Sequence, residues 1–167
     1  KEHNNLILVI GKTEGHLDQS LFARDILLEK KGPPPEINLF NEKNNGETIL
    51  KLIEENLVKS AHDVSLGGII IALSKMSIKG NKGFKLDKLK ILMNKFEYFF
   101  GEDQGRYILE ISKDKLKKVE TILKENSVHF DILGVVTDKE IIIDNEPILS
   151  VDELIKSNTK WLNEYMV

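Results

Sequence analysis

Residues 62–68 combine polar side chains with a glycine pair in a way that could hold an anion. The candidate groups are His62, Asp63, Ser65, Gly67 and Gly68, and an apolar, helix-forming run follows them directly. Glycine lacks a Cβ atom, so backbone amides can face outward there, and the start of a helix adds partial positive charge. The segment therefore predicts a binding site for an anion, phosphate in particular.

The same residues also permit a purely structural interpretation. Ser65 is a favourable N-cap for the helix that follows. Gly67 and Gly68 could then serve only to let that helix pack closely against its neighbours. Residue types and spacing alone leave both interpretations open.

His62 and Asp63 raise the question of a metal ion. Histidine titrates near neutral pH, and a carboxylate binds hard cations such as Mg²⁺. Neighbouring residues of a strand point to opposite faces, so we expect that these two side chains do not converge on one metal. Asp63 alone beside a bound phosphate fits better, because Mg²⁺ usually takes one or two carboxylates together with phosphate oxygens.

A second polar group, residues 102–106, contains Glu102, Asp103 and Arg106. These charges could hold a cation, or they could neutralise one another within a loop. The remaining histidines, His3, His16 and His129, show no ligand spacing. The sequence contains no Ser/His/Asp triad, Walker loop or dinucleotide fingerprint.

Composition restricts the class of protein. A chain of 167 residues with 41% hydrophobic and 31% charged residues is typical of one soluble globular domain, or at most two small ones. The net charge of −3 does not favour nucleic-acid binding, and no apolar run approaches the ~20 residues of a membrane span. The chain has no cysteine and no signal-peptide pattern, which predicts a cytoplasmic protein. Because it begins with Lys1, we expect a piece of a longer polypeptide.

Hydrophobic periodicity predicts the elements that position these groups. We expect strands at 6–10, 57–64, 84–86, 107–111, 129–137 and 140–144, and helices at 20–29, 42–56, 68–78, 113–124 and 151–165. The last two strands should meet at a tight turn at Asp138 and Lys139. The aromatic run 96–100 should belong to the core, with Phe96, Tyr98 and Phe100 on one face if it is extended. Mixed helices and strands indicate an α+β layered domain.

Two motifs add a resemblance to a known family. Residues 60–68, S-A-H-D-V-S-L-G-G, resemble the S-A-H-D-V-S-D-G-G segment of the large (synthetase) subunit of phosphoribosylformylglycinamidine synthases. Residues 99–107, F-F-G-E-D-Q-G-R-Y, are similar to the F-G-E-D-Q-G-R-Y block of that family. Shorter matches, including Trp161–Met166, extend the resemblance over nearly the whole chain.

The resemblance implies the second C-terminal-type domain of that synthetase. The expected fold is a single α+β domain over 1–167, a three-layer α/β/α domain of the aminoimidazole ribonucleotide synthetase C-terminal type with a mixed, largely antiparallel sheet. The family's ligase converts formylglycinamide ribonucleotide, ATP and glutamine-derived ammonia to formylglycinamidine ribonucleotide in purine biosynthesis. Its catalytic histidine and most ATP ligands lie in N-terminal-type domains, so we expect this domain alone to be inactive.

Site residues follow from the same resemblance. Asp63 matches a Mg²⁺-binding position and Ser65 a phosphate-contacting one. On the physical argument given above, and not from the resemblance, Gly67 and Gly68 would donate backbone amides. His62 is a further candidate for the nucleotide site.

Further candidates, cofactors and partners complete the expectation. Glu102, Gln104 and Arg106 are secondary candidates for the site. Leu66 replaces the family's usual aspartate, which removes one carboxylate from the loop. The expected cofactors are ATP and Mg²⁺, and the expected partners are the other synthetase domains, a glutaminase and nucleotide substrates. The alternative is a non-catalytic domain that docks the synthetase halves or recruits the glutaminase.

Overall fold

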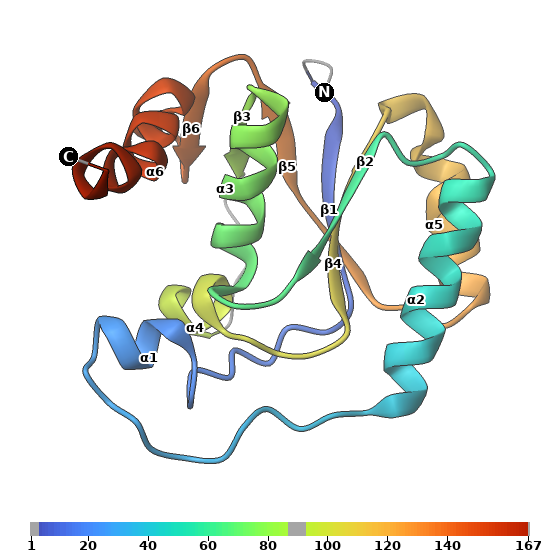
Figure 1. The fold of residues 1–167 in the computed structure, drawn as a ribbon. Coiled ribbons are helices and arrows are strands. Elements are labelled where there is room, and N and C mark those ends of the chain that lie inside the picture. Colours follow the sequence, from blue (N-terminus) through green and yellow to red (C-terminus); the bar gives the residue numbers. More distant parts are fainter. Residues whose placement is uncertain (1–3, 87–92, 167) are drawn as a thin grey trace.

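The computed structural model describes residues 4–86 and 93–166, and its middle layer is a seven-stranded sheet with helices on both faces (Figure 1). The strands lie in the order β2-β4-β1-β5-β3-β6-β7, and all neighbours are antiparallel except β3 and β6. The strands are β1 (Leu6–Ile10), β2 (Ser60–Val64), β3 (Gly83–Leu86), β4 (Arg106–Ile111), β5 (Phe130–Thr137), β6 (Glu140–Ile143) and β7 (Glu146–Ser150). The helices are α1 (Leu21–Asp25), α2 (Leu39–Glu54), α3 (Gly68–Gly80), α4 (Lys95–Phe100), α5 (Leu116–Glu125), α6 (Val151–Tyr165) and the short 3₁₀ turn η1 (Lys113–Lys115).

The central strand β1 explains the three layers. Successive side chains of a strand point to opposite faces, and the apolar run of β1 is buried on both of them. Leu8 and Ile10 pack in a core beneath α2 and α5, whereas Ile7 and Val9 belong to a second core beneath α3, α4 and α6. The expected three-layer α/β/α domain with a largely antiparallel sheet is therefore confirmed.

The predicted helix over 20–29 is wrong in length. Ser20 does cap it, since its hydroxyl accepts a hydrogen bond from the amide of Ala23. However, α1 ends at Asp25, and Leu28 adopts a φ of 57°, which no helix can accommodate. Three apolar side chains of the predicted helix, Ile26, Leu27 and Leu28, are consequently exposed.

The aromatic run is a helix rather than an extended segment. Asn94 and Glu97 form a capping box that starts α4. Tyr98 and Phe99 enter the core, but Phe96 is 57% exposed and stacks on Phe22 instead. The expectation that the run belongs to the core is therefore wrong for Phe96, and the shared face expected for an extended segment does not apply to a helix.

The last strands do not form the expected hairpin at Asp138 and Lys139. β3 lies between β5 and β6, so these two strands are not hydrogen-bonded to each other. The true hairpin joins β6 to β7, a strand that the sequence did not predict. Its turn residues, Asp144 and Asn145, have φ values of 54° and 68°, as a two-residue hairpin turn requires.

Tyr98 makes a testable contribution to stability at alkaline pH. Burial, and then the negative charge of Asp131, raise the pKa of its phenol to about 12, partly opposed by Arg106. An unfolded tyrosine titrates near pH 10, so this stabilisation is complete below pH 10 and is lost between roughly pH 10 and 12. We expect a loss of about 1.4 kcal/mol at pH 11 relative to pH 9. Urea unfolding at both pH values should show this loss, and Tyr98→Phe should lack that part of it.

Candidate functional site

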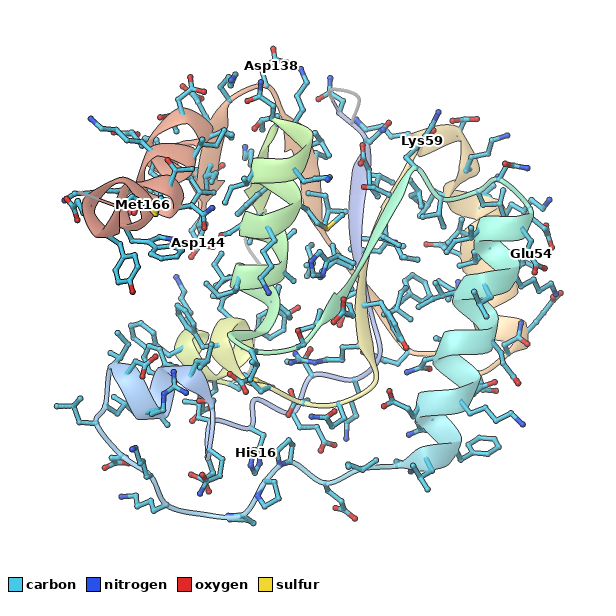
Figure 2. All side chains as sticks on the ribbon, in the orientation of Figure 1. His16, Glu54, Lys59, Asp138, Asp144 and Met166 are labelled. Atoms are coloured by element: carbon cyan, nitrogen blue, oxygen red, sulfur yellow. The ribbon has the colours of Figure 1, made fainter. Side chains whose placement is uncertain are left out.

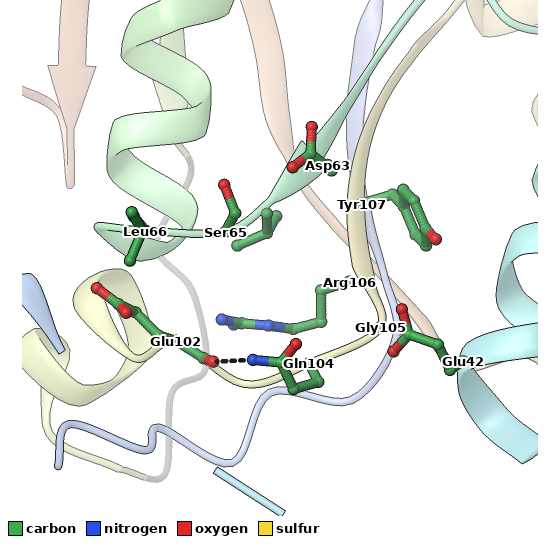
Figure 3. A pocket seen from close by; sticks show the side chains of 10 residues that line it. Glu42, Asp63, Ser65, Leu66, Glu102, Gln104, Gly105, Arg106 and Tyr107 are labelled. Carbon is green, nitrogen blue, oxygen red and sulfur yellow. Dashed lines mark hydrogen bonds between the residues drawn. The ribbon is translucent and has the colours of Figure 1, made fainter. Parts of the chain in front are cut away.

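An open pocket of about 250 Å³ lies where β2 leads into α3 (Figure 3). Its lining comes from the end of β2 and the following turn, from the segment that enters β4, and from the first turn of α2. The lining residues are Glu42, Asp63, Val64, Ser65, Leu66, Glu102, Gln104, Gly105, Arg106 and Tyr107. Both sequence motifs therefore contribute to one cavity.

Strand pairing brings the two motifs together. In the antiparallel register of β2 and β4, Asp63 lies opposite Tyr107 and Val64 opposite Arg106. The Asp63 side chain is 65% exposed, and Ser65 is exposed as well. The structure thus places the two leading candidates of the first motif at the pocket.

The glycine pair does not behave as expected. The amide of Gly67 donates to Oε1 of Glu102 at 2.8 Å, and the amide of Gly68 donates to the carbonyl of Ser65 at 3.0 Å. Both glycines are buried. The expectation that their amides face outward toward a phosphate is wrong, because the domain itself already occupies both hydrogen-bond donors.

Close packing explains why glycine stands at both positions. Gly67 and Gly68 have φ values of 84° and 69°, which side chains of L-residues rarely adopt. A Cβ atom at Gly68 would lie 2.5 Å from the carbonyl oxygen of Phe99 and 2.7 Å from that of Gly101. The N-cap of α3 is Gly67, so the alternative interpretation of Ser65 as the N-cap is wrong in that detail.

Glu102 serves as an internal anion at the start of two helices. Its Oε1 accepts hydrogen bonds from the amides of Gly67 and Leu21, both at 2.8 Å. A carboxylate is favourable at a helix N-terminus because the unpaired amides there carry partial positive charge. Glu102 thereby joins the first turn of α1 to the N-cap of α3.

Asp103 and Arg106 indicate whether residues 102–106 form a cation site or a loop whose charges neutralise one another. The carboxylate of Asp103 accepts hydrogen bonds at 3.0 Å from the amides of Glu14, Gly15 and His16. It also lies 3.4 Å from Nη1 of Arg106. The interpretation of this segment as a self-neutralising loop is thus supported over that of a cation site.

The guanidinium of Arg106 is fully committed within the domain. It donates to the carbonyl oxygens of Asp103 and Gly101 at 3.1 and 2.6 Å and to the hydroxyl of Thr13 at 3.2 Å. Burial lowers the pKa of Arg106, although the charge of Asp103 opposes this effect. Arg106 therefore contributes to the wall of the pocket rather than offering a free charge to a ligand.

His62 lies outside the pocket lining. Its Nδ1 is 2.5 Å from the backbone carbonyl oxygen of Asp63 and 3.4 Å from Oδ1 of that residue. The imidazole thus bends back toward its neighbour, although successive strand residues point to opposite faces. The expectation that the two side chains do not converge on one metal stays a prediction.

The pocket also contains two side chains that the sequence did not single out, Glu42 and Tyr107. Burial raises the pKa of the Tyr107 phenol, and the negative charges of Glu42 and Asp63 raise it further. Glu42 lies outside both motifs, so only the fold could identify it, whereas Tyr107 is the last residue of the second motif.

The described residues contain no group of three or more histidine, aspartate or glutamate side chains that could hold a metal ion. A metal at Asp63 would therefore depend mainly on ligand oxygens from outside this domain. Mg²⁺ accepts such an arrangement, because it binds phosphate oxygens and water alongside one or two carboxylates. In residues 4–86 and 93–166, none of the helices has the length and apolar character needed to cross a membrane.

Curated relatives match almost the whole chain. The phosphoribosylformylglycinamidine synthase subunit PurL of Pelagibacter ubique is 70% identical over 166 residues, which are 99% of this chain and 23% of the relative. The subunit of the same name from Rhodopseudomonas palustris is 35% identical over the same share of each chain. The chain thus spans less than a quarter of the length of these relatives.

Solved structures and a family profile agree with this result. Thermotoga maritima PurL complexed with FGAR superposes with a TM-score of 0.74 at 24% identity, over 93% of this chain and 28% of that one. At this identity the likeness shows the fold alone. The profile of the AIR synthase related proteins, C-terminal domain, matches residues 2–144. With most of its length matched, the chain belongs to the family of AIR synthase related proteins, as a C-terminal domain of that family.

Proposed function

We propose that this chain is the second C-terminal-type domain of a phosphoribosylformylglycinamidine synthase. The whole enzyme would be the cytoplasmic, ATP-dependent ligase that converts formylglycinamide ribonucleotide and ammonia to formylglycinamidine ribonucleotide. The 70% identical relative from Pelagibacter ubique, which bears this name, supports the proposal. The chain spans 23% of that relative. The domain would supply one part of a shared site, and we expect it to have no activity by itself.

The pocket is the part of the site that this domain contributes. Asp63 would hold Mg²⁺, and the hydroxyl of Ser65 would donate a hydrogen bond to a nucleotide phosphate. When bound, Mg²⁺ neutralises negative charge on phosphate oxygens. The observation that carries this assignment is that Asp63 and Ser65 line the same open pocket as the second motif. Related structures of PurL are described as complexes with ATP and with ADP, which is consistent with a nucleotide ligand.

The other ligand candidates have different roles. Gly67, Gly68, Glu102 and Arg106 fix the turn and the pocket wall, because their polar groups are bonded within the domain. Partners of the domain would be the remaining synthetase domains and a glutaminase that supplies ammonia. One related structure is described as PurLQS, an assembly that contains more than PurL.

Replacing Asp63 tests the nucleotide site. In the complete synthetase, we expect Asp63→Asn to weaken MgADP binding at least about tenfold, since even residues that only support a metal ligand are worth 10–100-fold in affinity. Isothermal titration calorimetry with and without Mg²⁺ measures the effect. Asp114→Asn is the matched control, because Asp114 is 72% exposed and lies outside the pocket lining.

A structural role is the second candidate function, and the internally bonded glycine pair favours it. Under this alternative the pocket binds nothing, and the domain only docks the synthetase halves or recruits the glutaminase. Unchanged MgADP affinity in both Asp63→Asn and Ser65→Ala would favour the structural role and contradict the nucleotide site.

A further inference from the structure

The C-terminal helix α6 is firmly anchored at its start. Val151 is fully buried, and Leu154 and Ile155 pack against the core beneath α3. Ser150 and Glu153 bond reciprocally, with the Ser150 amide donating to Oε2 of Glu153 at 2.7 Å and the Glu153 amide donating to the Ser150 hydroxyl at 3.2 Å. The first turns of α6 are therefore a fixed part of the domain.

The second half of the helix has no such cover. Every side chain that the structure describes between 156 and 166 is exposed, and α6 lies at the margin of the molecule with Met166 at its outer end (Figures 1 and 2). Trp161 and Tyr165 are 62% and 80% exposed, and their rings lie 6.4 Å apart. Helical segments of this length are marginal in water without tertiary packing.

These aromatic side chains continue the buried stripe of the same helix. Leu154 and Trp161 are seven residues apart, almost two full turns, so they lie on the same side of α6. Tyr165 follows Trp161 by four residues and shares that side. One amphipathic face thus begins in the core of the domain and runs on beyond it. Large exposed aromatic side chains of this kind mark protein interfaces.

The edge of the sheet beside α6 is less suited to docking than the exposed face of α6. β7 is the edge strand, and it contains Pro147, which has no backbone N–H for pairing with another strand. A partner that binds on this side of the domain would therefore contact α6 rather than the edge strand β7.

Two observations indicate which molecule the exposed aromatic face of α6 contacts. The family profile stops at residue 144, whereas the PurL relatives match 99% of the chain, so β7 and α6 are features that this chain shares with PurL beyond the general domain. More than three quarters of each relative lies outside the matched segment. We propose that the Trp161–Tyr165 face of α6 docks into an apolar groove elsewhere in the same synthetase polypeptide. This inference rests on the proposed function.

Photo-crosslinking tests the docking in the complete synthetase that contains this sequence. The crosslinking residue p-benzoylphenylalanine is placed at Trp161 in one protein and at Thr159 in another. Thr159 is the matched control, since it is exposed and lies on the opposite side of the helix. We expect the Trp161 position to crosslink efficiently to peptides outside residues 1–167 of the same polypeptide, and the Thr159 position to give at most about one tenth of that yield.

Other crosslinking results would overturn the docking. These are a crosslink to a second copy or to another subunit, equal yields at the two positions, or no crosslink at either. Hydrogen exchange gives a second measurement: amides 157–165 should exchange at least tenfold faster in Trp161→Ala than in the unmodified synthetase, and equal rates would contradict the proposal. MgADP binding is measured on the same preparations. If the unmodified synthetase does not bind MgADP while the Trp161 position still crosslinks as expected, the result would count against the nucleotide site and leave the docking supported.

Discussion

Replacing Asp103 with alanine should lower the free energy of unfolding by about 3–5 kcal/mol, the range seen when one partner of a buried ion pair is removed. The change would leave the Arg106 guanidinium, whose side chain is fully buried, without its countercharge. It would also remove the acceptor for three amides, those of Glu14, Gly15 and His16. Urea unfolding of the 167-residue chain measures the loss.

Two further variants separate charge from hydrogen bonding. Asp103→Asn keeps the size of the side chain and one carbonyl oxygen, so we expect a smaller loss than for alanine. Asp114→Ala removes a carboxylate that is 72% exposed and should change stability by no more than about 0.5 kcal/mol. If Asp103→Ala and Asp114→Ala had equal effects, the loop 14–16 would not depend on this carboxylate.

The sequence placed two of its five leading candidates, Asp63 and Ser65, at the pocket, but it did not anticipate the hydrogen bonds within the domain. The two motifs were recognisable because each is a continuous segment. Their meeting at one pocket depends on the pairing of β2 with β4, in which Asp63 lies opposite Tyr107. The acceptor that occupies the Gly67 amide, Glu102, lies 35 residues away in sequence. No local pattern could distinguish that internal anion from an external phosphate.

In the fold, too, the helices were predicted from local sequence, whereas the pairing of strands distant in sequence was not. The helix predicted at 151–165 matches α6, because its apolar periodicity is strong. The helix predicted at 68–78 is α3 with two more residues, because its apolar run is continuous and bounded by glycines. The pairing of strands was misjudged where β3 is inserted between β5 and β6, since pairing partners distant in sequence leave no periodic trace. The hairpin between β6 and β7 was missed although Asp144 and Asn145 are suited to its left-handed turn.

Gly68→Ala should destabilise the domain by about 2–5 kcal/mol. A residue other than glycine at a φ of 69° costs about 1–2 kcal/mol. The new Cβ atom would also meet the carbonyl oxygens of Phe99 and Gly101 at 2.5 and 2.7 Å, and overpacking against such fixed atoms adds typically 1–3 kcal/mol. Relief would require α3 and α4 to move apart. Urea unfolding measures the loss.

Gly46→Ala is the matched control in the same chain. Gly46 lies inside α2, and an added Cβ atom would meet only the Tyr107 hydroxyl at 3.6 Å, an ordinary contact. Since alanine is favoured over glycine in a helix, this variant should gain about 0.5–1 kcal/mol. Opposite signs for the two substitutions would establish that Gly68 is required for packing. A Gly68→Ala protein of unchanged stability would instead reopen the assignment of the glycine pair to ligand binding, because the close approach of α3 to α4 would then not explain it.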